Sequence, residues 1–382
     1  MLNKLYTLSA YLFCLVAILD PVNNVLGFKI PFFLFFTSCL IIKYKPNPKY
    51  FHTVICLVAI QFISILSGII FGLQIDMSFF LQYLTFFLTL FTLLWCKNID
   101  FINPVKLSCL ILSLITIIGY TAMLFYPEIE LVFYEFAISH DKLFLMSHRT
   151  FLGIEFNSFC YKSLPIVTIP TGIYFYKFIN EDSYKIQNLF LFLISAFALF
   201  CGGNRALMLS IFCIISIVLY SKYKKTFFYK SIISLFIILF IYIVWLALTE
   251  KGEGSNDIKY KHLESYAVYF ANNIFLDFWG GGAGSLFYSK GFQATVPLTE
   301  WTYIEIIRMY GIIGAFFIFR FLLRPFTKYK QKIKQIKYCS PVLIGYATFL
   351  IVCGSNPYLI NSTGLICILF IYSYIENPQN RI

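Results

Sequence analysis

Apolar residues recur along the chain in runs of roughly 15 to 22 residues, separated by shorter polar or basic segments. A helix needs about 20 mostly apolar residues to cross a bilayer, so this pattern is typical of membrane-spanning helices. It predicts an all-α fold: one integral membrane domain over residues 1–382, a polytopic bundle of about 12 transmembrane helices. The expected spans are, in order, Leu5–Leu19, Val25–Ile42, Phe51–Gly72, Phe79–Cys96, Leu107–Phe125, Phe159–Tyr176, Leu189–Cys201, Leu207–Tyr220, Ser231–Leu248, Tyr303–Leu322, Pro341–Cys353 and Leu359–Tyr374.

Two long polar stretches interrupt this pattern, at about 126–158 and 249–302. Within the second, apolar residues return at helical spacing between Asp257 and Phe275, beside charged positions. This segment predicts an amphipathic helix lying along the membrane interface. The residues of its expected apolar face are Tyr260, Leu263, Tyr266, Phe270 and Ile274.

The composition supports a membrane protein, because 59% of the residues are hydrophobic and only 13% are charged. The mean hydropathy is +0.78, higher than a soluble chain of this size can hide in its core. The first apolar run, Leu5–Leu19, lacks a small-residue cleavage site and leads directly into the next run. We therefore expect this first helix to be retained as a span rather than removed as a signal peptide.

The net charge of +12 raises the possibility of a nucleic-acid partner, but its distribution favours a topology signal instead. Alternate loops and the two tails carry 17 Lys and 3 Arg against 4 acids, a net charge of +16, whereas the opposite side carries −4. Basic residues are retained in the cytoplasm, so both termini are expected there, in a bacterial inner membrane, with both long loops outside. We expect no nucleic-acid partner.

Metal and redox chemistry find no support in the residue spacing. Eleven Cys occur without a C-x-x-C pair, and the four His lack a metal-ligand spacing. Most of the Cys lie in apolar runs, where a thiol behaves as a small hydrophobic group. We expect neither a metal nor a cofactor.

Three of the six Arg, namely Arg149, Arg205 and Arg308, fall on the outer side, against the topological bias. A guanidinium binds phosphate through two parallel hydrogen bonds, so outward Arg beside a membrane suits a phosphorylated lipid. Snorkelling or a local ion pair is the alternative. Arg205 lies in the tight turn Gly202–Ala206, which could equally be an ordinary connection between two helices.

A second candidate segment begins with the glycine-rich run Gly280–Gly284 and continues through Glu300 and Glu305 to Gly311–Gly314. Glycines at this density permit a sharp, close-packed return of the chain towards the membrane. They are weak evidence for phosphate binding, because the Lys-Ser/Thr of a P-loop is absent. Glu300 could also favour a helix N-terminus through the helix dipole or capping.

The order of these features resembles the O-antigen polymerase and ligase superfamily: an outer-turn Arg, a long outer loop, a glycine-rich run, a polar and aromatic segment, then G-I-I-G. In the ligase branch the segment before the helix begins with His. At the corresponding spacing from Gly311 this chain has Glu300, while Tyr303 matches the ligase pattern. This difference makes the chain more similar to the Wzy-type polymerases than to the ligases.

The resemblance implies a metal-independent glycosyltransferase that joins oligosaccharide repeat units carried on undecaprenyl pyrophosphate at the periplasmic face. Under it, Arg149, Arg205 and Arg308 would hold the pyrophosphate, and Glu300 or Glu305 would be the general base. Its partners would be the lipid-linked oligosaccharide, membrane lipid and a chain-length regulator protein. Two alternatives remain open: an O-antigen ligase that transfers polymer to lipid A core, and a polysaccharide-lipid flippase or other transporter.

Overall fold

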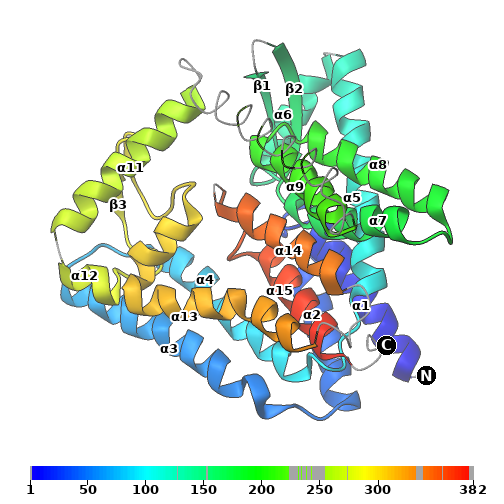
Figure 1. Cartoon of the computed structure of the whole chain (residues 1–382). Coiled ribbons are helices and arrows are strands. Elements are labelled where there is room, and N and C mark those ends of the chain that lie inside the picture. The colour runs from blue at the N-terminus through cyan, green and yellow to red at the C-terminus, as the bar shows by residue number, and fades with distance from the viewer. Residues whose placement is uncertain are drawn as a thin grey trace.

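The computed structural model describes residues 2–126, 128–151, 154–222, 254–272, 274–332, 339–354 and 356–377, with four isolated positions between 231 and 242. Over these residues the chain is mostly helical (Figure 1). The α-helices are α1 (Leu2–Leu19), α2 (Lys29–Lys43), α3 (Phe51–Ile70), α4 (Met77–Thr89), α5 (Ile102–Phe125), α6 (Glu128–Ser139), α7 (Thr168–Asn180), α8 (Lys185–Cys201), α9 (Arg205–Lys222), α11 (Gly254–Asn272), α12 (Ile274–Trp279), α13 (Thr302–Lys332), α14 (Cys339–Gly354) and α15 (Ser362–Glu376).

Six of the described segments are long and apolar enough to cross a membrane, so the prediction of a helical membrane protein is supported at this level. Three further apolar helices, α8, α14 and α15, are shorter. The predicted span Ser231–Leu248 lies almost entirely outside the described residues. The six long segments are Leu2–Leu19, Pro48–Ile70, Met77–Trp95, Ile102–Phe125, Arg205–Lys222 and Thr302–Lys328.

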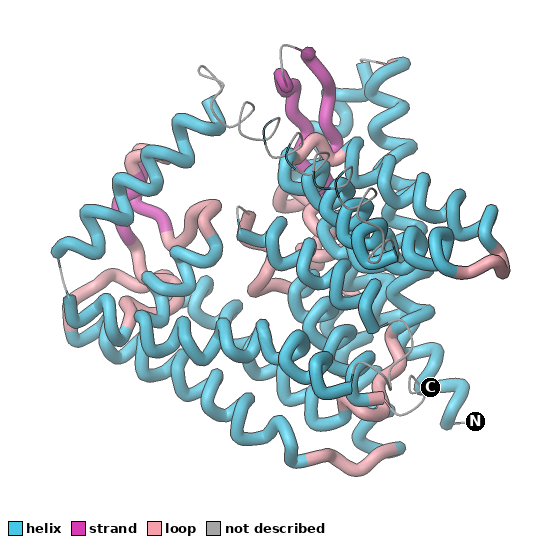
Figure 2. Tube along the Cα trace, viewed as in Figure 1, coloured by secondary structure: helices cyan, strands magenta, loops and turns pink. Residues whose placement is uncertain are grey.

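The structure also contains two antiparallel hairpins that the apolar pattern did not predict (Figure 2). Strands β1 (Phe144–Phe151) and β2 (Ile154–Tyr161) form the first, and β3 (Phe287–Ser289) and β4 (Ala294–Val296) form the second. The first hairpin and helix α6 occupy most of the stretch expected to be a long loop.

The expected span Phe159–Tyr176 is wrong in its first half, because β2 continues to Tyr161 and α7 begins only at Thr168. Pro165 explains the late start. A proline lacks an amide hydrogen and clashes with the preceding turn inside a helix, so it is placed at the beginning of one. Here Pro165 opens the short 3-10 helix Leu164–Val167, which leads into α7.

Helix α15 lies at the centre of the bundle, between α1, α13 and α14 (Figure 1). Every one of its residues from Thr363 to Glu376 is buried. A helix that is apolar on all sides can satisfy its side chains only in a protein or lipid interior, which accounts for this position. Its first turn is fixed by Asn361, whose side chain accepts a hydrogen bond of 3.0 Å from the amide of Gly364.

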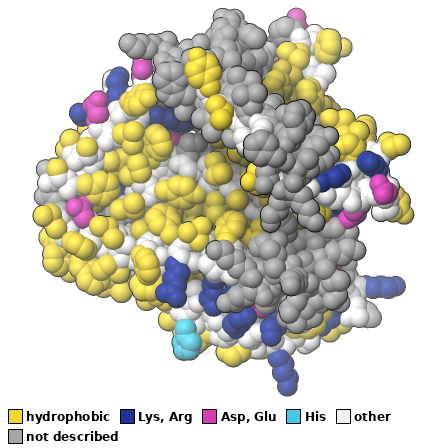
Figure 3. All heavy atoms as spheres, viewed as in Figure 1, with side chains coloured by type: hydrophobic (Ala, Val, Ile, Leu, Met, Phe, Trp, Pro, Cys, Tyr) yellow, Lys and Arg dark blue, Asp and Glu magenta, His cyan; other side chains and the backbone are white. Residues whose placement is uncertain are grey.

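Peripheral helices bury one side and leave the other apolar. On α3, Gln61 and Ser64 face inward, while Phe62, Leu66 and Ile69 are about half exposed. Apolar side chains cover much of the face seen in Figure 3. Such extensive exposed apolar surface is what a lipid-facing protein presents.

Hydrogen bonds group the loops at two opposite ends of the helical bundle. Successive loops were expected to alternate between two sides from the distribution of basic residues. At one end Tyr6 bonds to Asn98, and Asn377 bonds to Ile99, so the described parts nearest the two termini meet there. Glu376 at the end of α15 binds Lys49 at 3.0 Å and Lys328 at 2.6 Å at this same end. We call it the basic end.

At the other end Tyr161 donates to the carbonyl of Leu19, and Ser362 donates to that of Pro21. The amide of Asp76 donates to Gly284, and the amide of Leu286 donates to Gln74. The candidate residues from the sequence belong to loops, helix starts or the first hairpin at this end. We call it the arginine–acid end.

Candidate functional site

The glycine-rich run packs against a break in α13. Gly311 has φ +65° and ψ 177°, a conformation available almost only to glycine, and it interrupts the helix. The carbonyls of Arg308 and Met309 lose their helical partners there and accept hydrogen bonds from the amides of Gly281 and Gly282, at 3.0 and 2.8 Å. The close-packed return predicted from the glycines is thus confirmed.

These contacts explain why every residue of the run except Ala283 is glycine. A Cβ at Gly280 would lie 2.3 Å from the carbonyl oxygen of Met309, and one at Gly284 would lie 2.4 Å from that of Asp76. The amides of Gly281 and Gly282 are committed to backbone carbonyls within the protein. The glycines therefore serve close backbone packing, and these two amides do not form a phosphate cradle.

Arg308 and Glu305 form a buried ion pair one turn apart on α13. Arg308 is 0% exposed and Glu305 is 2% exposed, and Nε of the Arg lies 2.8 Å from Oε2 of the Glu. The guanidinium also donates to the carbonyl and hydroxyl of Ser285 and to the carbonyl of Pro297. It therefore fastens the 285–297 loop onto α13.

The pyrophosphate role expected for Arg308 needs an accessible guanidinium, and this one is enclosed by protein groups. Its central carbon also lies 4.3 Å from the centre of the Phe287 ring, over the face of the aromatic system. Its surroundings match the alternative given for these Arg residues in the sequence analysis, a local ion pair. We infer a structural role for Arg308 and assign it no direct contact with a ligand.

Helix α11 contributes a hydroxyl to this cluster. Tyr266 is buried and donates a hydrogen bond of 2.5 Å to Oε1 of Glu305, and it also bonds to the hydroxyl of Thr299. Burial raises the pKa of Tyr266, so the phenol stays neutral and remains a donor. The amide of Thr299 donates a further bond of 2.8 Å to the same carboxylate oxygen.

The face of α11 that packs against the protein differs from the one predicted. Tyr266 is buried as expected, but Tyr260 is 59% exposed, while His262 and Ser265 are buried. Ile274 lies beyond the end of α11 and is the 73% exposed first residue of α12. The reason is polar pairing: His262 bonds to Ser289 at 2.8 Å, and Ser265 accepts from the amide of Lys290. Hydrogen bonds to the 285–299 loop orient this helix more than apolar residues do.

Glu300 is the accessible acid of the segment. Its carboxylate lies 3.5 Å from the ammonium of Lys259 on α11, and its side chain is 38% exposed. Trp301 beside it donates to the carbonyl of Lys259 at 3.2 Å, which holds this stretch against α11. Within the described residues the carboxylate makes no hydrogen bond to the first turn of α13, so the capping contact considered for it is not formed.

Arg205 is the first residue of α9, after the turn that begins at Gly202. Asn204 caps this helix by accepting a hydrogen bond of 2.9 Å from the amide of Ala206. Gly203 has φ +60°, and a Cβ there would lie 2.1 Å from the Cβ of Ser158 in β2. The turn is therefore pressed against the first hairpin, and Arg205 itself is half-buried.

Arg149 lies on that same hairpin, in β1 opposite Phe156. Two residues earlier, Ser147 pairs with Ser158, the residue that contacts Gly203. The chain thus brings the backbone of Arg149 to the hairpin that supports the Arg205 turn. The side chain of Arg149 lies outside the described part of the structure.

Loop 356–361 connects the two groups of candidates. The hydroxyl of Thr302, at the start of α13, donates to the carbonyl of Asn356 at 2.7 Å. Tyr358 is buried and its hydroxyl bonds to Cys160 in β2, two residues from Ser158. One short loop therefore touches both the α13 start and the hairpin.

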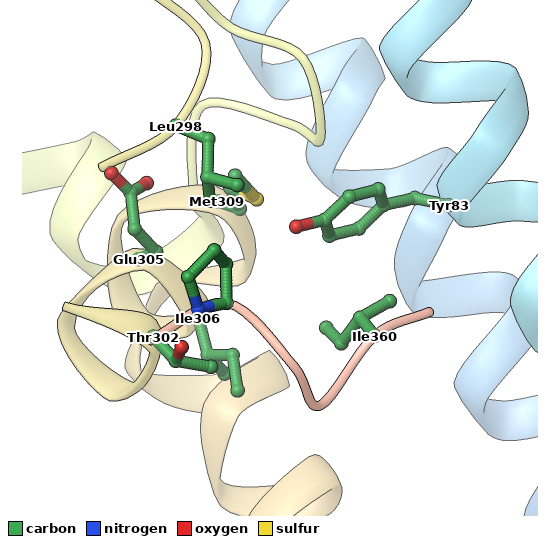
Figure 4. Close-up of a pocket in the computed structure, with 8 residues that line it drawn as sticks. Tyr83, Leu298, Thr302, Glu305, Ile306, Met309 and Ile360 are labelled. Atoms are coloured by element: carbon green, nitrogen blue, oxygen red, sulfur yellow. The ribbon is translucent and has the colours of Figure 1, made fainter. Parts of the chain in front are cut away.

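A small pocket opens at this junction (Figure 4). Four elements line it: α4, the loop before α13, the first two turns of α13 and loop 356–361. Glu305 lines it together with a tyrosine from α4, whereas Glu300 does not. The lining residues are Tyr83, Leu298, Thr302, Glu305, Ile306, Met309, Pro357 and Ile360.

Sequence reasoning missed the residues that complete this site. Tyr266, Thr299 and Ser285 satisfy the buried pair, and Tyr83 reaches the pocket from α4. Tyr266 stood in the predicted α11 face, but only as an apolar residue. Within the described residues, no group of three or more His, Cys, Asp or Glu side chains could hold a metal ion.

Comparison of the chain with protein-family models, curated proteins and solved structures found no match.

Proposed function

We propose that this protein is a polysaccharide polymerase of the Wzy type, which joins oligosaccharide repeat units carried on undecaprenyl pyrophosphate. In this proposal it spans a bacterial inner membrane about a dozen times as one domain, with both termini in the cytoplasm and the arginine–acid end in the periplasm. It uses neither metal nor cofactor. Membrane lipid and a chain-length regulator protein are its further partners.

One observation carries the proposal: an accessible acid and a half-buried Arg at a helix start occupy the same end of a bundle of apolar helices. Glu300 stands at the start of α13, Arg205 opens α9, and loop 356–361 touches the elements that support both. A lipid-linked sugar pyrophosphate presents its charge at the membrane surface and its sugars just beyond it. An Arg and a carboxylate at one rim are the groups that such a substrate requires.

The proposed reaction is a substitution at an anomeric carbon. A hydroxyl of one lipid-linked repeat unit attacks the anomeric carbon of the growing chain, and a new C–O bond forms. The bond from that carbon to pyrophosphate breaks, and its electron pair leaves with undecaprenyl pyrophosphate. The hydroxyl proton passes to Glu300, while Arg205 and Arg149 stabilise the charge developing on the leaving group. Glu305 is the second candidate base.

The two alternatives of the sequence analysis are weaker. A ligase of this superfamily has a His where this chain has Glu300. A transporter usually has ionisable residues or broken helices near the middle of the membrane. Here the ion pairs Glu305–Arg308 and Glu376–Lys328 lie at opposite ends of the bundle, and the break of α13 at Gly311 lies in the first third of that helix.

The lipopolysaccharide of a deletion strain tests the proposal against both alternatives. A polymerase defect is expected to give core carrying a single repeat unit. Bare core together with lipid-linked polymer would indicate a ligase, and accumulated lipid-linked units on the cytoplasmic side would indicate a flippase. Restoration of the ladder by the full-length chain is the control for polar effects of the deletion.

The topology gives a direct prediction. Single cysteines placed in a cysteine-free background at Lys142, Lys259 and Lys290 should react with a membrane-impermeant thiol reagent from outside. Cysteines at Lys224 and Lys332 should react only after the membrane is permeabilised. External labelling at Lys224, or protection at Lys290, would contradict the proposed orientation.

For Arg205 we expect loss of function even when the charge is kept. Arg205→Lys should reduce polymer formation about 10- to 100-fold, because a point-charge ammonium cannot reproduce two parallel hydrogen bonds to phosphate. Arg205→Ala should reduce it further. The measurement is the polymer ladder, normalised to protein in the membrane. A normal ladder in Arg205→Ala would leave Arg205 as a snorkelling residue.

For Glu300 we expect Glu300→Gln to reduce polymerisation about 100-fold or more, because an amide cannot accept the hydroxyl proton. Glu264→Gln is the matched control, since Glu264 is also an accessible acid of this region and pairs with Lys290 at 3.1 Å. Both variants lose one surface ion pair, but only Glu300→Gln should lose activity. Normal activity in Glu300→Gln would contradict the role of Glu300 as the base, and the substitution Glu305→Gln would then test the second candidate.

A further inference from the structure

The pocket at the start of α13 contains a hydroxyl that the fold does not use. Tyr83 extends from α4, and its hydroxyl points across the pocket towards the first turns of α13 (Figure 4). Within the described residues this hydroxyl has no hydrogen-bond partner, although Tyr83 is only 6% exposed. The oxygen itself is not fully enclosed by protein, so a polar group that enters the pocket can bond to it.

The ring of Tyr83 is held independently of its hydroxyl. It stacks on Phe79, one turn earlier on α4, with 5.0 Å between the ring centres. This aromatic contact fixes the direction of the side chain. The hydroxyl is therefore presented to the pocket by packing and contributes nothing visible to the stability of the fold.

The remaining walls restrict what can enter. Leu298, Ile306, Met309 and Ile360 are apolar, and the free space accommodates about one water-sized group. Pro357 is exposed and Leu298 is half-buried, so the pocket opens between the loops that carry them. A single hydroxyl fits this space, whereas a sugar ring or a phosphate does not.

Two polar residues at the start of α13 also line the pocket, although the Glu305 carboxylate is turned away from Tyr83 (Figure 4). Glu305 has two carboxylate oxygens with about four acceptor positions, of which Tyr266, Thr299 and Arg308 occupy three. Thr302 donates its proton to Asn356 and so can only accept a further hydrogen bond. One acceptor position on Glu305 and those on Thr302 remain.

We propose that this pocket binds one hydroxyl group of the sugar acceptor, with Tyr83 as its hydrogen-bond partner. The inference rests on the proposed function and deepens it, because it separates acceptor binding from the pyrophosphate contacts of Arg205. Tyr83 is then a positioning residue: it orients the acceptor sugar relative to Glu300 and takes no proton in the reaction. The apolar walls select a hydroxyl over a charged group.

Tyr83→Phe tests this inference because it removes the hydroxyl and keeps the stacked ring. Tyr346→Phe is the matched control, since Tyr346 is also buried but its hydroxyl donates to the carbonyl of Leu322 at 3.0 Å. Both variants are made in the full-length chain and purified in detergent. The probe is the undecaprenyl-pyrophosphate-linked repeat unit, and the measurements are the thermal unfolding midpoint, its rise on adding the probe, and the kinetics of polymer formation.

For Tyr83→Phe we expect an unchanged midpoint without the probe, a smaller rise with it, and a KM about 3- to 10-fold higher, the effect of one lost hydrogen bond. Tyr346→Phe should show the opposite pattern: a lower midpoint with wild-type KM. Wild-type KM and wild-type stabilisation by the probe in Tyr83→Phe would overturn the inference, whatever the activity. If the wild-type protein forms no polymer but Tyr83→Phe weakens stabilisation by the probe, the pocket stands and the polymerase proposal fails.

Discussion

Arg308→Ala is expected to destabilise the protein by about 3–5 kcal/mol, because it leaves the Glu305 carboxylate buried without its counter-charge. The loop 285–297 would also lose the guanidinium that binds Ser285 and Pro297. Arg308→Lys should recover only part of the loss, since one ammonium cannot reach three partners in the geometry of a guanidinium. The measurement is thermal unfolding in detergent together with the amount of protein in the membrane.

Arg320→Ala is the matched control for this experiment. Arg320 lies on the same helix three turns further on, is exposed, and should change stability by less than about 0.5 kcal/mol. Arg308→Ala protein with wild-type stability would contradict the buried pair. If the Arg308→Ala protein is stable but inactive, Arg308 again becomes a candidate residue for binding the pyrophosphate.

Gly311→Ala is the second substitution for which we expect a large effect, a loss of at least about 3 kcal/mol. Two penalties add there. Alanine is strained at φ +65°, and its Cβ would lie 2.2 Å from the carbonyl oxygen of Phe278. The chain can relieve this clash only by separating α13 from α12 and the glycine-rich run.

Gly72→Ala separates the two penalties. Gly72 also has a positive φ, +70°, but a Cβ there would meet nothing within 4 Å. It should therefore cost only the conformational term, about 1–2 kcal/mol. The comparison uses the same unfolding measurement, and equal losses in the two variants would show that the contact between α13 and the glycine-rich run contributes little.

Individual residues show how far the sequence could predict the site. The glycines were expected to give a close-packed return, and their contacts with Met309 and Asp76 confirm it. The sequence indicated both Glu305 and Arg308 as site residues, but it did not predict that they form a buried ion pair. A spacing of three residues on a helix is compatible with either an exposed or a buried pair. Ser285 and Pro297 decide the matter, and they lie on either side of the β3–β4 hairpin, outside any helix.

The first hairpin marks a limit of a different kind. Residues 144–161 contain both apolar and polar positions, and the apolar end of this stretch continues into the run expected to be a helix. Strand formation there depends on the pairing of residues such as Ser147 with Ser158 across a turn. A periodicity analysis of one segment does not contain that information.

By itself the sequence determined that most of the chain forms apolar helices and that its loops divide into a basic and a less basic side. Both follow from local properties: run length relative to bilayer thickness, and the position of Lys and Arg between the runs. Tertiary structure alone decided which Arg is enclosed, which acid stays accessible, and that Tyr83 of α4 faces the start of α13. The first two outcomes depend on contacts of α13 and the residues before it with the 285–297 segment and α11, and the third on segments more than 200 residues apart, Tyr83 and Glu305. Burial at these positions is a property of the assembled bundle.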